Sequence, residues 1–143
     1  MKTPHFLNVD LEIESKSSLR PLAREFGDQA VIMFSGKIKG RHWLYIETAV
    51  YRKQPDATIQ ALCALIEKLS STGRRLWDTA QRKTFDIGYE TRLSSELANQ
   101  FQLRPTTLRR LAALGATLAI TIYREEDPLM LLKPVKSGAD RRG

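Results

Sequence analysis

Apolar and polar residues alternate regularly near the start of the chain. Between positions 7 and 14 every second residue is apolar, and the residues between are polar. This period of two is typical of a β-strand with one buried face. The residues expected to point into the core are Leu7, Val9, Leu11 and Ile13. Their polar neighbours, expected on the opposite face, are Asn8, Asp10, Glu12 and Glu14.

A helical period follows this strand. Four apolar residues fall at i, i+3, i+4 and i+7, a spacing that places them on one side of an α-helix. They are Leu19, Leu22, Ala23 and Phe26. Ser17 or Ser18 can cap the start of this helix, and Gly27 can end it. The sequence therefore predicts a short amphipathic helix.

Alternation returns between residues 31 and 50, with Gly40 near the middle. A glycine between two alternating runs is typical of a hairpin turn, so two antiparallel strands are expected. Their apolar positions are Ile32, Phe34 and Ile38 before the glycine and Leu44, Ile46 and Val50 after it.

Both patterns recur in the second half of the chain. Pro55 and Asp56 begin a helical stripe that ends before Gly73, and this is expected to be the longest helix. Its apolar residues are Ile59, Leu62, Cys63, Ile66 and Leu69. A fourth strand is then predicted from the alternation of Phe85, Ile87 and Tyr89 with Asp86, Gly88 and Glu90.

The region before Pro105 fits neither pattern cleanly. Residues 94–104 are compatible with a helix or a strand, and Pro105 stops a helix from running through it, so an irregular connection is expected. A helix is predicted from Pro105 to Leu114, with Leu108, Leu111 and Ala112 on its buried face. A final strand follows, with buried residues Leu118, Ile120 and Ile122.

The predicted order is strand, helix, two strands, helix, strand, helix and strand. Its first six elements match the ferredoxin-like order βαββαβ, in which an antiparallel sheet carries helices on one face. We therefore expect an α+β fold, a two-layer sandwich with a mostly antiparallel sheet and an added C-terminal helix and strand. Residues 1–132 are expected to form a single domain, and residues 133–143 a basic, flexible C-terminal tail.

Part of the sequence resembles a known family. The resemblance lies in the run from Trp77 to Glu90 (WDTAQRKTFDIGYE), in Leu103, Pro105 and Leu108, and in the run from Leu111 to Tyr123 (LAALGATLAITIY). These segments resemble the bacterial domain of unknown function 4279 family. The resemblance implies a small bacterial cytoplasmic domain. That family has no established activity, cofactor or catalytic residues to carry over to this chain.

Composition favours one small domain. The 143 residues are 42% hydrophobic and carry a net charge of +7, and a chain of this length can bury one sizeable core. Its apolar runs are too short for a signal peptide or a membrane span, so a cytoplasmic location is expected.

The single cysteine, Cys63, falls in an apolar helical pattern and is expected to be an unreactive core residue. Part of the positive charge lies in the predicted tail, at Lys133, Lys136, Arg141 and Arg142.

The residues opposite the predicted core face are the main candidates for a binding surface. They combine carboxylates of the first and fourth strands with an aromatic pair on the third. Because ferredoxin-like order places the first strand between the third and the fourth, these groups are expected to be neighbours. The candidate binding face consists of Glu12, Arg41, Trp43, Tyr45, Asp86 and Glu90.

Carboxylates on neighbouring strands repel each other by about 0.2–1 kcal/mol per directly opposed pair, so an offset is expected. Cross-strand pairing with Arg41, Lys37 or Arg124, together with water, is one offset. A partner is another, either a second copy of the chain or a cationic or peptide ligand lying over Trp43 and Tyr45 through cation–π attraction. A divalent metal on the carboxylates is the third.

Residues typical of catalysis form no recognisable constellation in the sequence. His5 and His42 are expected at the surface, and the pattern contains neither a nucleophile elbow, nor a histidine pair at metal-ligand spacing, nor a Gly-rich phosphate loop. The sequence therefore predicts a non-enzymatic module without a cofactor, which binds a protein partner, a small ligand or a second copy of itself.

Nucleic-acid binding is the alternative hypothesis. The segment from Lys39 to Ile46 resembles the start of the RNA-recognition signature, which places aromatic residues on an open sheet face. However, the carboxylates expected on that face repel phosphate. The alternative therefore relies on the tail and on the basic loop residues Arg74, Arg75, Arg82 and Lys83.

Overall fold

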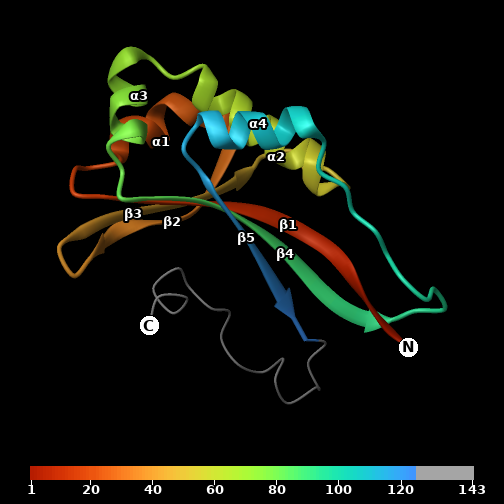
Figure 1. Cartoon of the computed structure of the whole chain (residues 1–143). Helices are drawn as coiled ribbons and strands as arrows, with labels where there is room; N and C mark the ends of the chain where they lie inside the picture. The colour runs from red at the N-terminus through yellow and green to blue at the C-terminus, as the bar shows by residue number, and fades with distance from the viewer. Residues whose placement is uncertain (125–143) are drawn as a thin grey trace.

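The computed structural model describes residues 1–124 (Figure 1). The strands in this part of the chain are β1 (Lys2–Ser15), β2 (Ala30–Ile38), β3 (Arg41–Thr48), β4 (Arg82–Leu93) and β5 (Thr117–Tyr123). The helices are α1 (Arg20–Phe26), the short 3-10 helix η1 (Gly27–Gln29), α2 (Pro55–Glu67), α3 (Ser71–Asp78) and α4 (Pro105–Ala113). The predicted tail at 133–143 and the predicted end of the domain at residue 132 lie outside the described residues.

The five strands form one open sheet with the order β2-β3-β1-β4-β5. Strand β1 is central and pairs antiparallel with β3 on one side and with β4 on the other. Strand β2 pairs antiparallel with β3, whereas β5 pairs parallel with β4 after the chain crosses over through α4. The predicted α+β class with a mostly antiparallel sheet is therefore confirmed.

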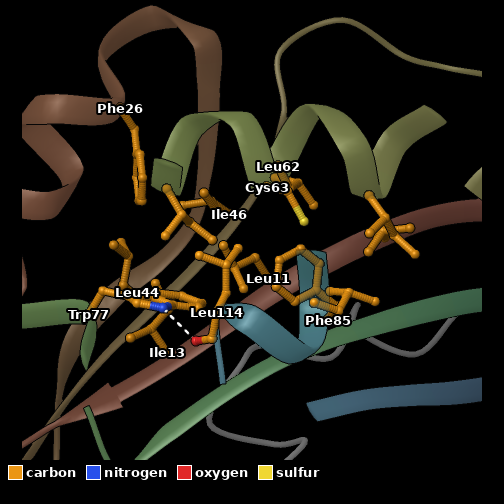
Figure 2. Close-up of a cluster of buried hydrophobic side chains, with 14 of the residues drawn as sticks. Leu11, Ile13, Phe26, Leu44, Ile46, Leu62, Cys63, Trp77, Phe85 and Leu114 are labelled. Atoms are coloured by element: carbon orange, nitrogen blue, oxygen red, sulfur yellow. Dashed lines mark hydrogen bonds between the residues drawn. The ribbon is translucent and has the colours of Figure 1, made fainter. Parts of the chain in front are cut away.

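The four α-helices formed by residues 1–124 all lie on one face of this sheet (Figure 1). The core fills the space between the helices and the sheet, where Val9, Leu11 and Ile13 of β1 are fully buried. Leu62 and Cys63 of α2 reach the same cluster from the helix layer (Figure 2). Burying each large aliphatic side chain contributes about 1.5–3 kcal/mol, so this one-sided core holds the two layers together.

Trp77 is the largest fully buried side chain among residues 1–124. Its indole Nε1 donates a hydrogen bond of 2.9 Å to the backbone carbonyl oxygen of Leu114, immediately after α4 (Figure 2). The chain then turns into β5 at Gly115, whose φ of 69° favours glycine. Trp77 therefore ties α3 to the turn between α4 and β5.

Strand β1 contains a bulge between Phe6 and Asn8. An extra residue in one strand shifts the alternation of side chains by one position. Phe6 therefore joins the core at 9% exposure, opposite Tyr89, while Leu7 is only half-buried. The predicted inward position of Leu7 is wrong, and the predicted burial of the later apolar residues of β1 is confirmed.

Strand β2 contains a second bulge, between Ile32 and Phe34. Ile32 pairs with Ile46, whose side chain is in the core, and Phe34 pairs with Tyr45, whose side chain is on the other face. The prediction that Ile32 and Phe34 share a face is therefore wrong. The predicted hairpin is confirmed, with Gly40 in its turn at a φ of 81°.

The predicted long helix ending before Gly73 is in fact two helices, α2 and α3. Ser70 caps α3, because its Oγ accepts a hydrogen bond of 3.1 Å from the Gly73 backbone N–H. The Glu25 carboxylate accepts hydrogen bonds from the Ser70 N–H and hydroxyl at 2.7 and 2.8 Å, and these bonds lower the pKa of Glu25. Gly73 lies inside α3, where a Cβ atom would collide with that carboxylate.

The C-terminal part of the described chain departs from expectation in helix α4 and in strand β5. Of the predicted buried face of α4 only Leu111 is buried, whereas Leu108 is 46% exposed and Ala112 is exposed, because the helix turns Thr107 and Leu111 to the core. Residues 94–104 form neither helix nor strand and α4 begins at Pro105, as predicted. Strand β5 differs, because Ile120 and Ile122 are 61% and 60% exposed and only Leu118 packs against the core. Among residues 1–124, β5 has a neighbouring strand on one side only, so its predicted burial fails beyond Leu118.

Candidate functional site

The side chains of β1, β3 and β4 that point away from the core share one surface. We call it the helix-free face, because no helix formed by residues 1–124 lies over it (Figure 1). Strand pairing places Glu12 opposite Tyr45, Glu14 opposite Trp43, and Asp10 opposite Asp86. Its residues are Asp10, Glu12, Glu14, Arg41, Trp43, Tyr45, Glu47, Arg82, Asp86 and Glu90.

Glu12 lies near the centre of this face. Its Oε1 is 3.6 Å from Nη2 of Arg82, and Tyr45 lies opposite it on β3. The Tyr45 ring is 6.1 Å from the Trp43 ring at 86°, and 5.9 Å from the Phe34 ring. Edge-to-face pairs of this kind stabilise beyond the area they bury. The structure therefore places a carboxylate and a packed aromatic group side by side.

Cation–carboxylate pairs border this centre. Nη1 of Arg41 lies 3.8 Å from Oε2 of Glu14, which supplies the cross-strand pairing considered as one offset for the repulsion. Asp86 stands opposite Asp10 and accepts a hydrogen bond of 2.8 Å from the Thr121 hydroxyl of β5. These contacts offset part of the repulsion between carboxylates.

Glu90 lies apart from the other predicted site residues. It pairs with His5 across the strands and accepts a hydrogen bond of 3.0 Å from Nε of Arg92 on its own strand. Four residues of extended strand separate it from Asp86, a distance of about 13 Å. The structure thus brings Glu12, Trp43 and Tyr45 together, with Arg41 and Asp86 beside them, and leaves Glu90 at the far end.

The helix-free face is less exposed than expected. Trp43, Tyr45 and Glu12 are 9%, 2% and 3% exposed, and Asp10 is 5% exposed. The expectation of an open aromatic surface is therefore wrong for these side chains, although they do lie on the face away from the helices. Carboxylates are almost never buried to this extent unless they are paired. The low exposure of Glu12 and Asp10 is therefore a distinguishing feature of this site.

Two residues that contact the centre of this face are not predicted from the sequence. Arg82, which pairs with Glu12, is predicted only in a basic loop, yet alternation along β4 from Asp86 puts it on this face. Phe34 of β2 is predicted in the core, and only the bulge in β2 turns this ring towards Tyr45.

The basic residues of the alternative hypothesis interact within the fold. Nε of Arg74 lies 3.1 Å from Oδ1 of Asp78, Arg82 pairs with Glu12, and Nζ of Lys83 lies over the Trp77 ring at 5.7 Å. Three of the four predicted loop cations are thus engaged with neighbouring groups. Nucleic-acid binding through these residues therefore stays a prediction.

Groups with reactive potential are few in the described part of the chain. Between residues 1 and 124 no three His, Cys, Asp or Glu side chains are grouped so that they could hold a metal ion. None of the helices formed by these residues is long and apolar enough to cross a membrane.

Cys63 is fully buried under α2, and burial raises the pKa of its thiol to about 11. The thiolate is the reactive species, so at pH 8 we expect Cys63 to react with DTNB at least about 100-fold more slowly in the folded chain than in urea. The Cys63 thiol ionises more easily in the unfolded chain than in the folded chain. Burial of the protonated thiol therefore stabilises the fold below the ordinary cysteine pKa, and this stabilisation is lost as the pH rises towards about 11. Equal rates of labelling in the two states would show that Cys63 is accessible.

Comparisons with known proteins add no relative. No family model matches the sequence, and no curated protein or solved structure gives a significant match. The resemblance to the domain of unknown function 4279 family therefore stays a prediction.

Proposed function

We propose that this domain is a non-enzymatic interaction module that binds a basic protein segment along the helix-free face. One observation carries the proposal: Asp10, Glu12, Trp43 and Tyr45 are each less than a tenth exposed, on a face where residues 1–124 place no helix. In an antiparallel sheet with helices on one side, the other face is usually solvated. A surface with buried carboxylates and packed aromatic rings is suited to binding a segment that lies over it.

Charge and ring chemistry together define the segment that fits. Carboxylates on three adjacent strands favour Lys or Arg, and the Trp43 and Tyr45 rings favour apolar side chains and cations. Residues 129–142 of the chain itself have this composition, with the run Leu129 to Leu132 followed by Lys133, Lys136, Arg141 and Arg142. The same chemistry can come from this chain, from a second copy or from another protein.

A finer description of the fold accompanies this proposal. We infer that β1 to β4 with α1 and α2 form a ferredoxin-like unit, to which α3, α4 and β5 are additions. The central position of β1 between β3 and β4 supports this inference.

A binding measurement on the full chain tests the function. A labelled peptide with the sequence of residues 129–142 is titrated with the protein at low salt, and fluorescence anisotropy is recorded. We expect saturable binding that the double variant Glu14→Gln/Asp86→Asn weakens at least about fivefold, because both half-buried carboxylates lie on the helix-free face. The matched control, Asp28→Asn/Glu96→Gln, changes two exposed acidic residues elsewhere and should bind like the unaltered chain.

The source of the segment is decided by two further arms. Sedimentation over a range of concentrations reveals a dimer if the segment comes from a second copy. A full chain carrying Lys133→Ala, Lys136→Ala, Arg141→Ala and Arg142→Ala binds the peptide more tightly if its own segment competes. Absence of binding in every chain at low salt, or equal weakening in the control, contradicts the proposed function.

A further inference from the structure

A second site lies on the other side of the sheet, at the start of α1. A half-open cavity of about 290 Å³ lies there, between the approach to α1 and the β2–β3 hairpin, and Leu19, Gly36 and Trp43 form part of its lining. The polar side chains that line it are Ser18, Arg20, Ser35, Lys37 and His42. Its volume is close to the lower limit for sites that hold small organic ligands.

Strand pairing explains why these side chains converge. Ser35 pairs with Leu44, whose side chain is buried in the core, so Ser35 lies on the helix side of the sheet. Lys37 pairs with His42, and both keep the alternation that places them on that same side. Trp43 of the helix-free face also lines the cavity, so the site adjoins that face. Its polar residues belong to the helix side, and the site does not depend on the function proposed for the helix-free face.

The charge that residues 1–124 place around this cavity is of one sign. None of their carboxylates lines it, and within this part of the chain the side chains of Arg20, Lys37 and His42 make no ion pair or side-chain hydrogen bond. Six arginines elsewhere in the described chain pair with carboxylates, namely Arg41, Arg74, Arg82, Arg92, Arg104 and Arg110, whereas others such as Arg75 do not. What distinguishes Arg20 is that it shares a cavity with Lys37 and His42. Two unpaired cations and an imidazole that converge on one cavity create a positive potential that an anion would neutralise.

We propose that this cavity binds the phosphate group of a small phosphorylated ligand. The Arg20 guanidinium offers a planar pair of donors, Lys37 offers an ammonium, and His42 offers a ring N–H. The Ser18 and Ser35 hydroxyls complete a set of donors suited to the several terminal oxygens of a phosphomonoester. A nucleic acid fits less well, because its chain of phosphates extends beyond a cavity of this size.

The test uses the full ¹⁵N-labelled chain, titrated with inorganic phosphate and then with pyrophosphate at constant ionic strength. We expect saturable chemical-shift changes at the amides of Ser18, Ser35, Lys37 and His42. Arg20→Gln and Lys37→Gln should each weaken binding about tenfold, since each removes one charge-assisted contact. Both residues are exposed, so the variants are expected to fold.

Matched variants separate a site from general attraction to a basic protein. Lys53→Gln and Arg75→Gln remove exposed cations elsewhere and should leave the affinity unchanged. Shifts that never saturate, or equal weakening in the controls, overturn the proposal. So does a single-stranded oligonucleotide that binds at these residues more tightly than pyrophosphate, because it assigns the cavity to nucleic acid.

Discussion

Replacing Trp77 with alanine is expected to lower the free energy of unfolding by about 3–5 kcal/mol. The indole is fully buried among residues of the sheet, α1 and α4 (Figure 2), so truncation leaves a cavity. It also removes the donor that binds the Leu114 carbonyl oxygen at 2.9 Å. Urea unfolding followed by circular dichroism measures the loss. With an ordinary total stability of about 5–15 kcal/mol, this change removes a large fraction of it.

A second variant separates the hydrogen bond from the packing. Trp77→Phe keeps much of the ring volume but leaves the buried Leu114 oxygen without its donor, so we expect a smaller loss of about 1–3 kcal/mol. Leu97→Ala, at a side chain that is 82% exposed, should change stability by less than about 0.5 kcal/mol. A loss below about 1 kcal/mol for Trp77→Ala would contradict the role of Trp77 as the tie between α3 and the α4–β5 turn.

Alternation predicted the sheet well where a strand runs unbroken with one face on the core. Leu11 and Ile13 are buried, and their neighbour Glu12 lies on the other face, because a period of two allows no other arrangement. It failed at the two bulges. The extra residues there are Leu7 and Met33, ordinary apolar residues that leave no mark in the sequence.

Glycine shows a related limit of sequence reasoning. Gly73 was interpreted as the end of a helix, yet it lies inside α3, where the Glu25 carboxylate leaves no room for a Cβ atom. That contact joins two helices far apart in the sequence. A local pattern holds no information on it, which is also why the division into α2 and α3 was missed.

The candidate site also has a part that the sequence predicted and a part that only the tertiary fold determines. Alternation and strand order together predicted that Glu12, Trp43 and Tyr45 would meet, but they did not predict that each would be less than a tenth exposed. The cavity at the start of α1 had no sequence signature at all. Its polar residues come from a loop, a helix and two strands, and each resembles an ordinary surface residue until the fold brings them together.

Phe6→Ala provides the sharpest test of the bulge in β1, with an expected loss of about 3–5 kcal/mol in the free energy of unfolding. The Phe6 ring lies 6.4 Å from Tyr51, 6.1 Å from Tyr89 and 6.4 Å from Phe101, so removing it opens an aromatic cluster. Burial raises the pKa of Tyr89. In the variant, water reaches the cluster, and the pKa of Tyr89 should fall towards its ordinary value, which NMR of labelled tyrosine can follow.

The neighbouring residue supplies the matched control, because unbroken alternation and the bulge predict opposite results. Without a bulge, Leu7 would point inward and Leu7→Ala would cost about 2–5 kcal/mol, while Phe6→Ala would cost little. With the bulge, Leu7 is only half-buried, and its truncation should cost about 1 kcal/mol. A larger loss of unfolding free energy for Leu7→Ala than for Phe6→Ala would mean that β1 has no bulge and that its alternation continues unbroken through Leu7. In that case the hydrogen bond that the Asn8 side-chain amide donates to the Glu47 carboxylate, just beyond the bulge, would not form.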